Sequence, residues 1–315
     1  MTAVVVKGGS QTLIQAGPRT GQRHFGVPAA GAADCLSLAL ANRLVGNAAF
    51  LPALEAVLLG PTLKFESATH IALVGGVANA KINGEPVKFH QTIAVVAGDE
   101  LVIGPVSKGA RVYLAFAGGL VADDMLGSVS TYLPARLGGL AGRAVRAGDR
   151  LRSAARPGVR PLLTTPPEFQ PPMPASRAIR ACLSAESHWL DDALAGSLFD
   201  RNWTISQRAD RMGLELRGKP LAIGSHASMP SVPVFPGTLQ CPPSGVPLLL
   251  GVDAQTTGGY PRLLQVARAD LHLIGQLRPG DSLRFLRREP DEAIAELHAK
   301  HNYWRTWLPD IEQVI

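Results

Sequence analysis

Short apolar runs alternate with turn signals over much of the first half of the chain. In the stretch HIALVGGVANAKINGEPVKFHQTIAVVAGDELVIGP, residues 70–105, turn signals stand at Asn83-Gly84 and Gly98-Asp99. Apolar runs of this length between turns predict consecutive β-strands and hairpins. A Gly-Asp pair also begins at Gly148 and at Gly280, each time just before a strand-like run. We therefore expect the same tight turn to enter three strands.

Helical spacing is clearest in DCLSLALANRLVGN, which predicts a helix over residues 34–46. Leu36, Leu40 and Leu44 form an apolar stripe along one side of that helix. Asp34 can cap its first turn, and Gly46 can end it in a left-handed conformation. Near the end of the chain, EPDEAIAELHAKHNYW predicts a terminal helix that Pro290 opens.

A proline-rich stretch divides the chain. SAARPGVRPLLTTPPEFQPPMPASR, residues 153–177, has seven prolines and no usable periodicity. It predicts a linker over 156–177 between an N-terminal β-rich domain, 1–155, and a C-terminal domain, 178–315. The 315 residues suit two domains of ordinary size. The segment LEAVLLGPTL at 54–63 resembles LELRGKPL at 214–221, and this internal similarity favours two related domains.

Composition narrows the classes of partner. The formal charge of +6 comes mostly from scattered arginine, without a basic run, so we expect no nucleic-acid partner. No apolar stretch reaches the ~18 to 20 residues of a membrane span, and the start lacks the basic region of a signal peptide. The three cysteines lie far apart, as expected of buried thiols in a reducing compartment. These features predict a cytoplasmic protein without a membrane partner.

Several common site signatures are absent. The chain has no G-x-S-x-G, H-E-x-x-H or C-x-x-C motif, and we expect no metal site. GLELRGKP at 213–220 has the spacing of a phosphate-binding loop, but Pro220 stands where Ser or Thr would bind magnesium. We interpret that segment as a strand and turn. No lysine motif for attaching biotin is present either.

Two glycine-rich polar stretches are candidate binding loops. QAGPRTGQRHFGVPAAGAAD at 15–34 brings Arg19, Arg23 and His24 next to flexible glycines at the start of a helix. It fits an anion-binding loop and an ordinary loop before a capped helix equally well. LGSVSTYLPARLGGLAGR at 126–143 offers the hydroxyl groups of Ser128, Ser130 and Thr131, although such turns are also common on surfaces.

A third stretch, DAQTTGGYP, follows the continuous apolar run GVPLLLGV, which predicts a buried strand that delivers Asp253 at its end. Gly258 and Gly259 permit positive φ. Just upstream, SQRADRMG places two arginines within four residues, and bidentate arginine is the usual grip on a carboxylate or phosphate. The residue types alone also fit a turn without a ligand, in which the Asp253 side chain bonds its own backbone.

A family resemblance runs through these motifs. GVPAAGAADCLSLALANRLVGN, LPALEAVLLGPTLKF, YLAFAGGL, LGSVSTY, SQRADRMG and DAQTTGGYP occur in the order found in the allophanate hydrolase subunit 2 family. The chain is identified as a member of that family from about Gly17 to about Phe285. The resemblance implies a mainly β fold, a β-rich α+β arrangement of two related domains with cyclophilin-like β-barrel architecture.

The resemblance also implies an activity. It points to the C subunit of a bacterial ATP-dependent 5-oxoprolinase, which opens 5-oxoproline (pyroglutamate) to glutamate with ATP hydrolysis. The implied partners are the B subunit, which is of the allophanate hydrolase subunit 1 type, and the A subunit, which is of the lactam-utilisation type. ATP would bind at the level of the complex, with no covalent biotin on this chain. The alternatives are a biotin-dependent carboxyltransferase acting on urea or a related amide, and a regulatory protein that binds a kinase inhibitor.

Site residues are carried over from the family motifs by position. Asp253 is expected to be the catalytic group. The expected substrate-binding residues are Arg208, Asp210, Arg211, Gln255, Thr256, Thr257, Gly258, Gly259, Tyr260, Ser128, Ser130 and Thr131. Ala16, Pro18 and Val129 stand where members of the family usually have Asp, Gly and Arg. These departures leave open a paralogue that acts on another lactam or amide.

Overall fold

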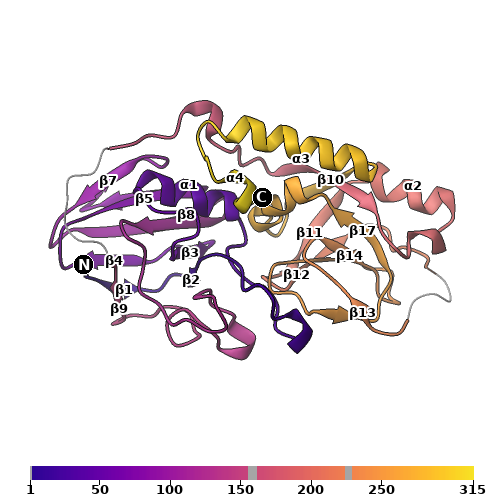
Figure 1. Cartoon of the computed structure of the whole chain (residues 1–315), viewed down its shortest axis with the longest axis horizontal. Helices are drawn as coiled ribbons and strands as arrows, with labels where there is room; N and C mark the ends of the chain where they lie inside the picture. Colours follow the sequence, from indigo (N-terminus) through magenta and orange to yellow (C-terminus); the bar gives the residue numbers. More distant parts are fainter. Residues whose placement is uncertain (1, 155–161, 224–228) are drawn as a thin grey trace. The chain divides into compact units, whose positions relative to one another are not determined.

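The computed structural model describes residues 2–154, 162–223 and 229–315. The chain divides into two compact units (Figure 1). Unit 1 contains the residues up to Thr20, Ala30–Met173 and Trp304–Val314; unit 2 contains Gly21–Ala29, Pro174–Tyr303 and Ile315. Both units are built mainly from β-strands, which confirms the expected mainly β fold.

The division differs from the predicted linker of residues 156–177. Its first part lies largely outside the described residues, and the rest belongs to unit 1 as far as Met173. There the Thr92 N–H donates to the Leu163 carbonyl at 2.8 Å, and Phe169 packs on Trp304 with ring centroids 5.3 Å apart. Prolines remove the periodicity from which elements are predicted, but the residues between them still pair and pack.

Unit 1 is organised around one sheet with the order β2-β3-β8-β4-β1-β9, and β5 joins β8 to β7 and β6. The strands are β1 Thr2–Lys7, β2 Gln11–Gln15, β3 Ala53–Val57, β4 Thr62–Phe65, β5 Thr69–Ile82, β6 Glu85–Pro86, β7 Thr92–Val95, β8 Glu100–Phe116 and β9 Arg150–Arg152. Apolar side chains from these strands, among them Leu54, Leu73 and Leu114, form its core.

The predicted helix of residues 34–46 is α1, Cys35–Leu44, which contacts β5 and β8. Asp34 caps it as expected, because its carboxylate accepts from the Ser37 N–H at 3.0 Å. Gly46 follows with φ of 70°, and Leu36, Leu40 and Leu44 are buried. A short helix α4, Ile311–Val314, also belongs to unit 1.

Unit 2 contains a closed barrel with the order β10-β17-β14-β15-β12-β11-β18. Its strands are β10 Ser176–Leu183, β11 Trp203–Ala209, β12 Gly213–Arg217, β14 Thr238–Gln240, β15 Leu248–Leu250, β17 Arg262–Val266 and β18 Ser282–Arg287. The β10–β18 pair is parallel and the other pairs are antiparallel. A separate ribbon pairs β13 Val232–Pro233 with β16 Thr257–Gly258. The helices are α2 Asp192–Asp200 and α3 Pro290–Trp304, with 3-10 turns at Arg23–Phe25, Ser187–Trp189 and Arg268–Gln276.

The three Gly-Asp pairs form the same turn, as predicted. Gly98, Gly148 and Gly280 have φ of 96°, 88° and 91°. In each turn the Asp carboxylate accepts from the backbone N–H three residues earlier, at 2.8 to 3.1 Å. Each pair also exchanges two backbone hydrogen bonds with one strand residue: Phe65, Val5 and Ile205 in turn. The first two turns lie in unit 1 and the third in unit 2, which supports two related units.

No helix among the described residues is long and apolar enough to cross a membrane.

Candidate functional site

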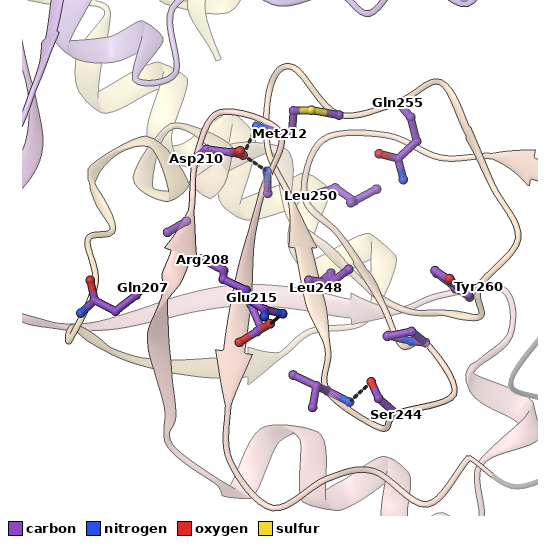
Figure 2. A pocket seen from close by; sticks show the side chains of 14 residues that line it. Gln207, Arg208, Asp210, Met212, Glu215, Ser244, Leu248, Leu250, Gln255 and Tyr260 are labelled. Carbon is purple, nitrogen blue, oxygen red and sulfur yellow. Dashed lines mark hydrogen bonds and ion pairs between the residues drawn. The ribbon is translucent and has the colours of Figure 1, made fainter. Parts of the chain in front are cut away.

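A cavity of about 730 Å³ lies on the outer face of the unit 2 barrel (Figure 2). Its size falls within the roughly 300–1,000 Å³ of small-molecule sites. The lining residues are Gln207, Arg208, Ala209, Asp210, Met212, Gly213, Glu215, Pro242, Ser244, Val246, Leu248, Leu250, Gln255 and Tyr260. The cavity therefore has an aliphatic part and several polar groups that can orient a ligand.

Strand alternation explains which side chains reach this cavity. Leu214 and Leu216 of β12 are buried in the barrel core, so Glu215 between them points outward. Leu249 of β15 is likewise in the core, and Leu248 and Leu250 line the cavity. The GLELR and LLL segments thus each supply one side to the core and the other to the site.

A β-bulge brings Arg208 to the cavity wall. Ile205 pairs with Leu216 and Ala209 pairs with Leu214, so residues 206–208 lie opposite the single residue Glu215. Bulges of this kind re-aim side chains beside functional sites. Here the bulge places Gln207 and Arg208 in the wall, with Arg208 Nη1 at 3.3 Å from Glu215 Oε2.

Asp210 also lines the cavity, but one of its oxygens forms the turn after β11. Its Oδ1 accepts from the N–H groups of Met212 and Gly213 at 2.7 and 3.1 Å. This is the local bonding that favours Asp in turns. Asp210 therefore shapes the loop that carries Met212 into the wall.

Arg211 and Asp253 are paired with each other inside the protein. The Arg211 Nε and Nη2 atoms donate to the two Asp253 carboxylate oxygens at 2.7 and 2.8 Å. Their side chains are 4% and 2% exposed, and neither residue lines the cavity. Arg211 was expected to bind a ligand carboxylate with two hydrogen bonds, but it makes those two bonds to Asp253 of the chain itself. The catalytic role of Asp253 stays a prediction, while its geometry favours holding two loops together.

The Thr-Thr-Gly-Gly segment is only partly at the cavity. Gln255 and Tyr260 line it, whereas Thr256, Thr257, Gly258 and Gly259 do not. Thr257 and Gly258 form β16, which pairs with β13.

Neither glycine of this segment has a positive φ, so the structure does not use the conformational freedom that they permit. Close approach explains them instead. A Cβ on Gly258 would lie 2.7 Å from Gln240 Nε2, and one on Gly259 would lie 2.9 Å from the Met229 carbonyl.

The predicted hydroxyl residues lie in unit 1, where they are buried. The hydroxyls of Ser128 and Ser130 donate to the Gly17 carbonyl at 2.9 Å, and that of Thr131 donates to the Ile14 carbonyl at 2.9 Å. Arg19 is fully buried and donates to the carbonyls of Met125, Ser128 and Ser130. These contacts favour the structural interpretation of the first glycine-rich loop over anion binding by Arg19.

Arg23 and His24 from that loop belong to unit 2. The Arg23 guanidinium donates to the Val234 carbonyl and lies 4.8 Å above the Phe235 ring. The loop therefore separates its three cationic candidates between the two units.

The sequence motifs did not single out several of the cavity residues: Gln207, Met212, Glu215, Ser244, Val246, Leu248 and Leu250. The alternation of apolar and polar residues in GLELR could have predicted Glu215, because it puts Glu215 on the face of the strand away from Leu214 and Leu216. The loop containing Pro242 and Ser244 carried no comparable pattern.

Two kinds of chemistry find no support among the described residues. No group of three or more His, Cys, Asp or Glu side chains there is placed to hold a metal ion. Burial raises the pKa of the Cys241 thiol to about 12, so this thiol, next to the cavity residue Pro242, does not readily form a thiolate.

The segment GLELRGKP folds as β12 and the turn after it, as predicted.

The barrel and its companion unit define the class of protein. The chain belongs to the family described as carboxyltransferase domain, subdomain A and B, whose model matches residues 25–287. The 5-oxoprolinase C subunit of Escherichia coli (strain K12) is 34% identical over 307 residues, covering 95% of this chain and 96% of that protein. The Haemophilus influenzae 5-oxoprolinase C subunit is 35% identical, covering 97% and 96%. The family resemblance inferred from the motifs is confirmed.

Larger proteins contain a similar region. Urea amidolyase of Lachancea kluyveri is 31% identical over 90% of this chain, which spans 17% of that protein. The crystal structure of the K. lactis urea amidolyase aligns with a TM-score of 0.89 at 28% identity, covering 96% of this chain and 19% of that one. The Kluyveromyces lactis urea carboxylase aligns with a TM-score of 0.86 at 27% identity, covering 96% and 28%. This chain spans less than a third of each of these two solved structures.

Proposed function

We propose that this chain is the C subunit of a bacterial ATP-dependent 5-oxoprolinase. In this role it acts with an A subunit of the lactam-utilisation type and a B subunit of the allophanate hydrolase subunit 1 type. The assembly opens 5-oxoproline to glutamate while ATP is hydrolysed. Coverage is the observation that carries the proposal: the chain matches 96% of two 5-oxoprolinase C subunits, but 17% of a urea amidolyase.

The cavity on the barrel supports a small-molecule role. Its apolar part can hold the methylenes of a lactam ring, and its polar groups can orient the ring amide and carboxylate. We expect the reaction to take place only in the assembly. The described residues of this chain include no group placed to hold a metal ion, and the segment with the spacing of a phosphate-binding loop, GLELRGKP, begins with strand β12.

The test is to co-express the chain with the products of its neighbouring genes and to measure glutamate formed from 5-oxoproline. Glutamate should form only when ATP and all three proteins are present. Omitting this chain, with the others retained, is the matched control. An intact assembly that forms no glutamate with ATP contradicts the proposal.

Biotin-dependent carboxyl transfer is the second candidate, favoured by the family's description and by the alignment with the urea amidolyase. It predicts that the chain carboxylates urea or a related amide when supplied with a carboxylated biotin carrier. Measuring that reaction and 5-oxoproline opening with one preparation separates the two candidates.

A further inference from the structure

We propose that Arg208 and Glu215 form a subsite for a lactam carboxylic acid, in which Arg208 binds the carboxylate and Glu215 accepts the ring N–H. The choice of 5-oxoproline as the ligand rests on the proposed function. The geometry of the subsite rests on the two side chains themselves, which lie next to each other in the cavity (Figure 2).

Arg208 offers the edge of its guanidinium that suits a carboxylate. Its Nη1 bonds Glu215, while its Nε and Nη2 donate to no residue within the described ranges. The Nε and Nη2 atoms together form the fork that grips a carboxylate with two hydrogen bonds. The side chain is 86% exposed, so this edge is open to a ligand.

Arg211, three residues away, provides the comparison. Its Nε and Nη2 are the atoms that hold Asp253, at 2.7 and 2.8 Å, in a pair that is almost fully buried. A ligand carboxylate would have to displace Asp253 to reach that edge. Of the two arginines that the sequence offered for this task, the structure therefore favours Arg208.

Glu215 completes the subsite as an acceptor. Its Oε2 faces Arg208, and its Oε1 accepts no hydrogen bond from the part of the chain that is described. An ionised carboxylate can only accept, so the group that pairs with Oε1 must be a donor. The N–H of a lactam is such a donor and stands on the ring atom next to the one that bears the carboxylate.

Unit 1 contains a buried glutamate at a similar position on its strand. Glu55 follows the core residue Leu54 on β3, which is antiparallel to both of its neighbours, as Glu215 follows Leu214 on β12. Glu55 Oε1 lies 3.3 Å from Arg111 Nε.

The other oxygen of Glu55, Oε2, accepts the Ala33 amide N–H at 2.9 Å and the Tyr113 hydroxyl at 2.7 Å. In unit 2, Arg208 is likewise 3.3 Å from one glutamate oxygen, and Glu215 lines the cavity. An amide N–H from a ligand at Glu215 Oε1 would match the Ala33 amide contact of Glu55.

Binding of three probes to the full-length chain tests the subsite, by calorimetry or ligand-observed NMR. The probes are 5-oxoproline, 2-pyrrolidone, which lacks the carboxylate, and cyclopentanecarboxylate, which lacks the whole ring amide, both its N–H and its carbonyl. Arg208→Gln should weaken 5-oxoproline binding by roughly ten- to a hundredfold, since a charged hydrogen-bonding group is lost, and leave 2-pyrrolidone unaffected. Glu215→Gln should weaken 5-oxoproline and 2-pyrrolidone binding but not that of cyclopentanecarboxylate.

Arg287→Gln is the matched control. Arg287 is paired with Glu289 at the same 3.3 Å, is 55% exposed and lies outside the cavity. This variant should bind all three probes like the wild type.

Failure of the subsite and failure of the proposed function give different results. Wild-type protein that does not bind 5-oxoproline, or an Arg208→Gln variant that binds it normally, overturns the subsite. An assembly containing Arg208→Gln with a wild-type kcat/KM for 5-oxoproline also overturns it, while the proposed function stands. Binding that depends on Arg208 in an assembly that forms no glutamate contradicts the function and keeps the subsite.

Discussion

The guanidinium of Arg211 and the carboxylate of Asp253 form a buried bidentate ion pair across 42 positions of sequence. The backbone reinforces it, because the Asp253 N–H donates to the Arg211 carbonyl at 3.0 Å. Each partner lies within two residues of the cavity wall: Met212 follows Arg211 directly, and Gln255 comes shortly after Asp253. The pair therefore fixes the distance between two parts of the candidate site.

Asp253→Ala should lower the free energy of unfolding by about 3–5 kcal/mol, because it leaves the buried Arg211 charge without its carboxylate. Urea denaturation followed by circular dichroism measures the change. A difference below about 0.5 kcal/mol, the range of ordinary surface substitutions, would contradict the structural role.

The double variant Arg211→Met with Asp253→Leu distinguishes positioning from catalysis. It should recover most of the stability lost in Asp253→Ala, since apolar replacement of a whole buried pair is often neutral or stabilising. A positioning role predicts that the double variant also regains activity in the assembly and keeps the wild-type pH profile. If Asp253 transfers protons, the double variant folds well and stays inactive.

Gly251→Ala should destabilise the same region. Its new Cβ would lie 2.3 Å from the Arg211 carbonyl oxygen, a backbone atom that cannot step aside. We expect a loss of about 1–3 kcal/mol, as for other overpacked positions. Gly196→Ala in α2 is the control, because nothing lies within 4 Å of its Cβ. Alanine there should raise helix stability by about 0.5–1 kcal/mol, so thermal midpoints should shift in opposite directions.

Arg19→Ala should loosen the loop that contains Ser128, Ser130 and Thr131. Three backbone carbonyls lose a charged donor, so we expect a total loss of at least about 3 kcal/mol, since each such hydrogen bond is worth about 1–3 kcal/mol. Hydrogen exchange should quicken at the amides of residues 128–131. Arg305→Ala, an exposed arginine of unit 1 paired with Glu312, should leave that exchange unchanged.

Glu186 should make stability depend on pH. The hydrogen bonds from the Arg262 side chain hold the pKa of Glu186 below its ordinary value. A lowered folded-state pKa stabilises the protein above the unfolded-state value, and this contribution is lost as the pH falls through the folded-state pKa.

Glu186→Gln should therefore lower stability by about 1–2 kcal/mol at pH 7, through the loss of a charged hydrogen-bond acceptor. The difference from wild type should shrink steadily below about pH 5, where the unfolded-state carboxyl begins to bind protons. Urea denaturation at several pH values measures it, with the exposed Glu289→Gln as control. A difference that stays constant down to about pH 3, below the ordinary pKa of a glutamate, would count against the pair.

Local signals predicted local structure well. The helix at residues 34–46, its Asp34 cap and the three Gly-Asp turns follow from side chains that bond within a few residues of themselves. The strand at 213–217 also followed from local chemistry, since Pro220 excluded the phosphate-loop interpretation. Such features depend little on the rest of the chain.

Features set by distant partners were not predicted. The sequence places Asp253 at the end of a strand and predicts a catalytic acid there. Its partner Arg211 could not be predicted, since it lies 42 positions away along the chain. The need for glycine at 258 and 259 is hidden in the same way, because the atoms that crowd these positions belong to Gln240 and Met229. The cavity was missed for a related reason, since barrel closure brings Glu215 and Leu248 together from separate strands.

The assignment of Gly21–Ala29 to unit 2, and of Trp304–Val314 to unit 1, bears on how such a chain can be divided. A gene cut once, at the codon after Met173, would give two fragments that each lack a piece of their own unit and carry a piece of the other. A single crossover between related genes at that point would create the same mismatch. Separating the two units cleanly would therefore take more than one cut in the gene.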